Sequence, residues 1–177
     1  MLYVAAIFLP LLGAVVTGFF GRWLGDRQSE LIACAMLILS ALISVFLFFE
    51  IAGSGQNIVV ELFAWIDSGN LQANWALKFD TLTVVMMVVV TVVSAMVHVY
   101  SIGYMAKDDA IPRFFAYLNL FTFFMLMLVT ADNLVQLFFG WEGVGLASYL
   151  LIGFWYKRPA ANAAAVKAFV VNRVGDF

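Results

Sequence analysis

The stretch Leu134–Phe154 reads LVQLFFGWEGVGLASYLLIGF and is long and apolar enough to cross a membrane as a helix. Its only formally charged side chain is Glu142, which falls close to the centre. A charge at that depth costs about 2.5–3.5 kcal/mol on insertion scales, whereas the same segment with Ser or Ala at this position would span the membrane without that cost. An intramembrane carboxyl therefore predicts ion or proton handling, with a partner elsewhere in the protein.

Composition places the whole chain in a membrane. Of the 177 residues, 65% are hydrophobic and 11% are charged, against about 45–50% and about 25% in soluble domains. The net charge of −2 gives no basic surface for nucleic acid. The single cysteine, Cys34, lies in an apolar run and excludes an internal disulfide or a multi-cysteine metal site.

Five runs are long enough to span the hydrocarbon core as helices. The first is expected to be a retained helix and not a cleaved signal peptide, because no Lys or Arg precedes it and no small-residue cleavage site follows it. The spans are predicted at Leu2–Phe20, Leu31–Ile51, Thr81–Gly103, Phe114–Ala131 and Leu134–Phe154.

A sixth segment, Ala160–Phe177, is predicted to be an incomplete span. It carries Lys167, Arg173 and Asp176, and no Gly cap, Pro or polar tail marks a natural helix end. We therefore expect an N-terminal fragment of a longer protein, with residues 1–177 forming one transmembrane domain.

Positive charges in the connections predict the topology. The odd-numbered loops hold six Lys and Arg residues, and the even-numbered loops hold only Lys78. This asymmetry predicts cytoplasmic odd loops and an N-terminus on the outer side. The six residues are Arg22, Arg27, Lys107, Arg113, Lys157 and Arg158.

The outer linker, residues 52–80, contains a predicted β-hairpin. Val59–Asp67 partly alternates polar and apolar residues, Ser68-Gly69-Asn70 supplies a turn, and Leu71–Phe79 follows. An irregular loop is the alternative. The predicted fold is thus an all-α polytopic membrane protein, a helix bundle with five full spans, a truncated sixth and an outer β-hairpin.

Glu142 lies in the sequence GWEGVG, where three glycines allow another backbone to approach closely. The alternative to proton handling is a neutral glutamic acid that bonds a neighbouring helix. Arg173 and Asp176 are three residues apart, so they share a helix face and can pair; a purely structural bridge is the alternative. Lys167 projects from a different face, and the alternative for it is a side chain that extends to the membrane interface.

His98, near the inner end of the third span, is predicted to be either a proton relay or an interfacial hydrogen-bonded residue. Asp80 is expected to cap the helix that begins at Thr81, and Asp132 is expected to lie in a turn. The sequence has no GxGxxG, no P-loop and no metal-ligand cluster.

Several motifs together resemble one family. They are RFFAYLNLF from Arg113, ADNL from Ala131, GWEGVG from Gly140, SYLLIGF from Ser148 and KAFVVNRVGD from Lys167. The chain resembles the L subunit of proton-pumping NADH–quinone oxidoreductase, respiratory complex I, which is chain 5 in mitochondria. The large subunit of multisubunit cation/proton antiporters shares much of these motifs.

The resemblance implies an antiporter-like fold in which Glu142 is an essential proton-pathway group paired with a lysine of the seventh helix. It implies that Arg173 and Asp176 tune that site, and because the seventh helix lies beyond this sequence, Glu142 is expected to lack its primary partner here. The predicted proton pathway comprises Glu142, Asp176, Arg173, Lys167 and His98.

The resemblance also implies partners and a location. The partners would be other membrane-arm subunits, especially a neighbouring antiporter-like subunit, and the location would be a bacterial or mitochondrial inner membrane. No cofactor is expected in this chain, since FMN, iron–sulfur clusters and quinone would be bound elsewhere in the complex. The alternatives are a subunit of a sodium/proton antiporter and a membrane scaffold whose charges only lock helices together.

Overall fold

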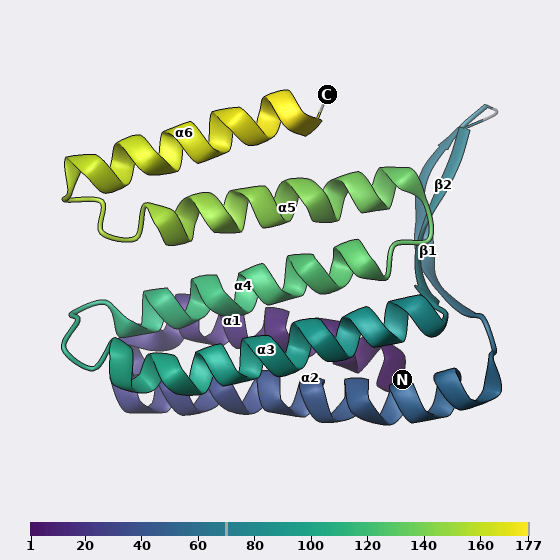
Figure 1. Ribbon diagram of the computed structural model, residues 1–177, viewed down its shortest axis with the longest axis horizontal. Coiled ribbons are helices and arrows are strands. Elements are labelled where there is room, and N and C mark those ends of the chain that lie inside the picture. Colours follow the sequence, from purple (N-terminus) through teal and green to yellow (C-terminus); the bar gives the residue numbers. More distant parts are fainter. Residues whose placement is uncertain (70, 177) are drawn as a thin grey trace.

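The computed structural model describes residues 1–69 and 71–176, which form six helices and a two-stranded antiparallel sheet (Figure 1). Asn70, in the predicted turn, and Phe177, at the predicted end of the sixth span, lie outside the described residues. The elements in chain order are α1 (Leu2–Leu24), α2 (Asp26–Ser54), β1 (Ile58–Ser68), β2 (Leu71–Phe79), α3 (Thr81–Tyr104), α4 (Ile111–Val129), α5 (Leu134–Ile152) and α6 (Pro159–Asp176).

Five of the described helices, α1 to α5, are long and apolar enough to cross a membrane, which confirms the predicted number of full spans. α6 is not among them, because its charged residues lower its hydropathy. α2 begins at Asp26 and ends at Ser54, beyond the predicted Leu31–Ile51. Polar residues at a span's ends can stay helical, and here the limits are set by Gly25 and Gly55, whose φ angles are 79° and 63°.

The first four helices form a packed bundle, which we call the α1–α4 bundle. α1 lies between α2 and α4, and α3 packs against both α2 and α4. Fully buried side chains from several elements meet in its larger core, including Ile7, Leu47, Phe79, Met87 and Met127. α5 lies beside α4, and α6 lies beside α5, outside the bundle (Figure 1).

The predicted hairpin is confirmed, with Ile58 paired to Phe79 and Ser68 to Leu71. It is fixed to the α4–α5 connection by three hydrogen bonds from different elements. The backbone N–H of Ala76 donates to Gln136 Oε1 at 3.1 Å, and that of Lys78 donates to the Thr130 carbonyl at 2.9 Å. Asn133 Nδ2 donates to the Asn74 carbonyl at 2.8 Å. These contacts satisfy part of a strand edge that would otherwise be unpaired.

The two ends of the molecule differ in charge. The hairpin and the α4–α5 connection lie at one end, which we call the hairpin end (Figure 1). The α1–α2, α3–α4 and α5–α6 connections lie at the other, which we call the basic end because the six loop Lys and Arg residues lie in or beside them. The side of the membrane that each end faces stays a prediction from these charges.

Asp80 caps α3 as predicted. Its Oδ1 accepts a hydrogen bond from the Thr83 backbone N–H at 2.8 Å, and Lys78 Nζ lies 3.5 Å from its Oδ2. The backbone hydrogen bond, reinforced by the Lys78 charge, lowers the pKa of Asp80 below its ordinary value. Asn133 caps α5 in the same way, through the Gln136 N–H at 2.9 Å, whereas Asp132 lies in the preceding bend.

Candidate functional site

The glycines around Glu142 place α5 against α4. A Cβ at Gly140 would stand 2.7 Å from the backbone of Leu128, and a Cβ at Gly143 would overlap the ring of Phe124. Both positions therefore require glycine for the observed approach of the two helices, as the sequence predicted. With this face of α5 turned to α4, the neighbouring Trp141 and Glu142 are free to meet α6.

The charged side chains of α5 and α6 form one cluster, which we call the α5–α6 seam. Arg173 forms an ion pair with Glu142, and its Nη1 also lies 3.7 Å from Asp176 Oδ2. Trp141 Nε1 donates to Asp176 Oδ1 at 2.5 Å. The three-residue spacing of Arg173 and Asp176 puts both on the face of α6 that meets α5.

Packing holds the guanidinium of Arg173 in this position. Its Cζ lies 4.5 Å from the centre of the Phe169 ring, one turn earlier on α6, which is a cation–π contact. A Cβ at Gly145 would stand 3.4 Å from Arg173 Nη2, so the head group packs against the α5 backbone at this position. Arg173 Nε is buried without a hydrogen-bond partner among the described residues.

The carboxyl groups of the α5–α6 seam are shielded to different degrees. The Asp176 side chain is 7% exposed, whereas Glu142 and Arg173 are 23% and 31% exposed. Two hollows flank the ion pair. One, of about 520 Å³, is lined by Glu142, Arg173 and the Phe124, Phe139 and Phe169 rings among others, and the second, of about 470 Å³, is lined by Trp141, Asn172 and Asp176 among others.

This arrangement can bind and release a proton. One guanidinium stands between two carboxylates, so the cluster carries one more negative than positive charge when both acids are ionised. In a low-dielectric slab an uncompensated charge is costly. A proton on either carboxyl removes it, and the guanidinium can then pair fully with the other.

Two of the five predicted pathway residues lie away from this cluster. His98 is fully buried inside the α1–α4 bundle, with its ring centre 6.0 Å from that of Phe115. The nearby tyrosines Tyr100 and Tyr104 are exposed and stack on each other, so they do not hold His98 at an interface. Lys167 is exposed on α6 and forms no salt bridge within the described part of the chain.

The predicted seventh-helix lysine partner of Glu142 lies beyond this sequence and stays a prediction, while Arg173, predicted to tune the site, pairs with Glu142 directly. Trp141 and Phe169 were not predicted as site residues. No local pattern marks them, because their roles depend on how α5 and α6 face each other.

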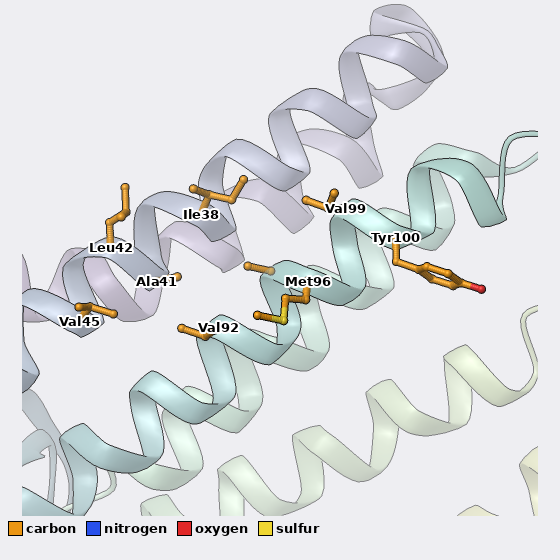
Figure 2. Close-up of a pocket in the computed structure, with 9 residues that line it drawn as sticks. Ile38, Ala41, Leu42, Val45, Val92, Met96, Val99 and Tyr100 are labelled. Atoms are coloured by element: carbon orange, nitrogen blue, oxygen red, sulfur yellow. The ribbon is translucent and has the colours of Figure 1, made fainter.

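The α1–α4 bundle also carries a groove of about 560 Å³ between α2 and α3, on a different face from the seam. Figure 2 shows Ile38, Ala41, Leu42 and Val45 of α2 opposite Val92, Met96, Val99 and Tyr100 of α3. Among the described residues that line it, Tyr100 alone is ionisable. The groove is therefore suited to apolar contact and not to proton transfer. Among the described residues no group of three or more His, Cys, Asp or Glu side chains could hold a metal ion.

Comparison with known proteins shows two matches to family models. Residues 65–115 match "NADH-Ubiquinone oxidoreductase (complex I), chain 5 N-terminus", and residues 131–177 match "NADH:quinone oxidoreductase/Mrp antiporter, TM". The second match includes every residue of the α5–α6 seam.

Curated relatives align with almost the entire chain. NADH-ubiquinone oxidoreductase chain 5 from Chondrus crispus is 55% identical over 176 residues, and that from Arabidopsis thaliana is 53% identical; each alignment covers 99% of this chain and 26% of the relative. NADH-quinone oxidoreductase subunit L from Rickettsia felis is 51% identical, over 99% of this chain and 27% of the relative. The chain thus spans about a quarter of the length of these relatives.

A solved structure shares the fold. A chain of the membrane-bound sulfane sulfur reductase, an archaeal respiratory membrane complex, aligns with a TM-score of 0.82 at 19% sequence identity. The alignment covers 98% of this chain and 35% of that one. This likeness supports the arrangement of the helices and the hairpin.

Proposed function

Because the chain belongs to the family of NADH–ubiquinone oxidoreductase chain 5 and NADH–quinone oxidoreductase subunit L, we propose that it is part of a proton-translocating subunit of complex I, with Glu142 as a proton carrier. The observation that carries the proposal is the Arg173 guanidinium shared between Glu142 of α5 and Asp176 of α6.

The proposed mechanism uses the excess negative charge of the α5–α6 seam. While Arg173 pairs with Glu142, that carboxyl stays ionised. A change of electrostatic field from the rest of the protein that draws Arg173 toward Asp176 would leave Glu142 unpaired, and an unpaired carboxyl in a low-dielectric site takes up a proton. Return of Arg173 to Glu142 would release it. Redox energy would supply the field change from elsewhere in the complex.

The rest of the complex would carry the redox chemistry. FMN, iron–sulfur clusters and quinone are proposed to bind to other subunits, and the partners of this chain are other membrane-arm subunits, one of them antiporter-like. The proposed location is the bacterial or mitochondrial inner membrane, with the basic end on the cytoplasmic or matrix side. Lys167 stays a proposed pathway residue on the strength of its charge and its place on α6 alone.

The test is Glu142→Gln in the full-length protein within its assembled complex, reconstituted in vesicles. Glutamine keeps the size and a hydrogen-bonding oxygen but carries no titratable proton. We expect proton pumping per NADH oxidised to fall strongly while the complex assembles normally. A second variant, Glu142→Asp, keeps the acid and should restore part of the pumping. Unchanged pumping in Glu142→Gln would remove Glu142 from the mechanism.

A sodium/proton antiporter subunit is the second candidate, since one matched family model is described for both complex I and Mrp antiporters. The seam residues fit either reading, because both need a carboxyl that exchanges ions. The curated relatives cited above, which are complex I subunits, favour the first reading. Pumping assayed in vesicles with and without Na⁺ separates the two, since a sodium exchanger stops without Na⁺ and a proton pump does not.

A further inference from the structure

The interior of the α1–α4 bundle contains a second polar cluster, remote from the α5–α6 seam. Ser94 Oγ of α3 and Thr122 Oγ1 of α4 are 2.5 Å apart, and His98 Nδ1 lies 2.8 Å from the Ser94 carbonyl oxygen. Asn119 Nδ2 donates to the Phe115 carbonyl at 3.1 Å. His98, Asn119 and Thr122 are each 1% exposed or less, so none of these groups can reach bulk water or lipid.

Two hydrogen-bonding atoms of this cluster have no partner among the described residues. They are His98 Nε2 and Asn119 Oδ1. Buried polar side-chain atoms usually have at least one partner, from the protein or from ordered water, and a buried unpaired group costs about 1–3 kcal/mol. Two such atoms inside one small bundle therefore point to something that bonds them.

Both unpartnered atoms are acceptors. Because a carbonyl can only accept, His98 Nδ1 must carry the ring proton in the neutral imidazole, which leaves Nε2 as a bare lone pair. The amide group of Asn119 donates to a carbonyl, so its Oδ1 is also an acceptor. A group that donates two hydrogen bonds would satisfy both atoms, and a water molecule is the smallest such group.

The register of the helices places His98 and Asn119 each about one turn from the Ser94–Thr122 contact, on the same side of it along the bundle. α3 and α4 run in opposite directions, and Ser94 meets Thr122. One turn further along α3 lies His98, and one turn earlier along α4 lie Leu118 and Asn119. Asn119 also shares the buried face of α4 with Phe115, which contacts the His98 ring. On α1, Gly13 faces Asn119 Oδ1, since a Cβ built at Gly13 would stand 3.0 Å from that oxygen.

Among the described residues, no charged side chain hydrogen-bonds to His98, Asn119, Ser94 or Thr122. Thr91, one turn from Ser94, donates to the Met87 carbonyl and is already satisfied. Cys34 of α2 is a titratable group buried in the same apolar cluster as Phe115. The remaining titratable residues of the bundle helices lie nearer the helix ends or on outer faces: Tyr3, Arg22, Asp26, Arg27, Glu30, Glu50, Tyr100, Tyr104, Arg113 and Tyr117.

We propose that the α1–α4 bundle holds an internal water that donates to His98 Nε2 and Asn119 Oδ1, and that His98 exchanges protons with this water during turnover. The site would lie nearer the basic end than Glu142 and on the other side of α4. Its role in turnover rests on the proposed function, whereas the presence of the water does not.

The first test is a high-resolution map of the assembled, unaltered complex. We expect a water peak within about 3.2 Å of both acceptors, the usual upper limit for such a bond. A dry site, or a protein donor that satisfies both atoms, overturns the proposal. This measurement does not depend on how any variant folds.

The second test uses His98→Gln, which cannot titrate, and Asn119→Leu, which removes one acceptor, in the full-length complex reconstituted in vesicles. Both should lose proton pumping per NADH oxidised while assembly is retained. The matched control is Thr91→Val, which removes a buried hydroxyl from the same face of α3 and should pump normally. Normal pumping in His98→Gln overturns the proposal. If Glu142→Gln fails to pump in the same assay while His98→Gln pumps normally, only this inference is lost, and the function proposed for Glu142 stands.

Discussion

The α5–α6 seam and the α1–α4 bundle place polar groups in the membrane in opposite ways. The seam joins one cation and two carboxylates from two helices, and the ion-paired Glu142 and Arg173 side chains are partly exposed. The bundle encloses hydroxyl, amide and imidazole groups that are buried or half-buried, and most of them hydrogen-bond to backbone carbonyls. The ion-paired groups thus lie between partly exposed helices, whereas the bundle contains hydroxyl and amide groups, which cost less to bury than charges.

The largest expected effect breaks the seam. Arg173→Met leaves two carboxylates without their cation, and removal of one partner from a buried pair costs about 3–5 kcal/mol. Because this pair is partly exposed, the lower part of that range is expected, together with loss of proton pumping per NADH oxidised. Pumping in vesicles and the thermal stability of the complex measure both effects.

Arg173→Lys is the control for that change. Lysine keeps the charge but loses the planar fork that serves two carboxylates and the stacking on Phe169. Partial pumping is expected. If Arg173→Met pumped as well as the unaltered protein, the shared cation would have no part in transport.

The next effect tests how the seam is positioned by α4. Gly140→Val would drive a side chain into the Leu128 backbone, and overpacking of this kind costs about 1–3 kcal/mol. We expect less assembled complex and a lower melting temperature. Gly103→Ala is the matched change, since a Cβ there meets nothing within 4 Å, and it should assemble normally. Equal yields of the two variants would contradict close packing at Gly140.

A smaller effect is expected inside the bundle. Ser94→Ala removes the contact with Thr122 Oγ1, but Thr122 keeps its bond to the Leu118 carbonyl at 3.1 Å. The cost should be close to that of one hydrogen bond, about 1 kcal/mol, read as a shift in the thermal melting of the complex. A loss of thermal stability as large as that of Arg173→Met would mean that the hydroxyl contact contributes as much to stability as the ion pair.

The smallest effect is local and lies at the hairpin end. The folded-state pKa of Asp80 is lowered, so its stabilisation of α3 is complete above the unfolded-state value, near 4, and is lost as pH falls through the folded-state value. Asp80→Asn keeps the capping oxygen but loses the charge. Protection of the first-turn amides of α3, relative to their intrinsic exchange rate at each pH, should be high at pH 7, lower in Asp80→Asn, and lower in the unaltered protein only well below pH 4.

Asp132→Asn serves as the comparison for that change, because Asp132 is exposed in a bend and makes no side-chain hydrogen bond or salt bridge in the part of the chain that the structure describes. Its exchange pattern should not change. Equal protection of α3 in Asp80→Asn and the unaltered protein would show that the Lys78–Asp80 charge pair adds nothing to the cap.

The sequence was sufficient wherever a residue's role depends on its near neighbours. Long apolar runs predicted the five spans, alternation around Ser68-Gly69 predicted the hairpin, and the position of Asp80 before Thr81 predicted a helix cap. The three-residue spacing of Arg173 and Asp176 likewise follows from helix geometry alone. Each of these features is set by local hydrogen bonding or by transfer of a continuous segment into lipid.

Tertiary structure decided which distant groups meet. That Arg173 pairs with Glu142, that Trp141 donates to Asp176, and that Ser94 meets Thr122 all depend on the register and rotation of neighbouring helices. Those are set by steric contacts such as Gly140 on Leu128, which arise only when whole helices pack. The sequence by itself thus determined that a charge lies within the membrane, and the packing of α5 between α4 and α6 determined its partner.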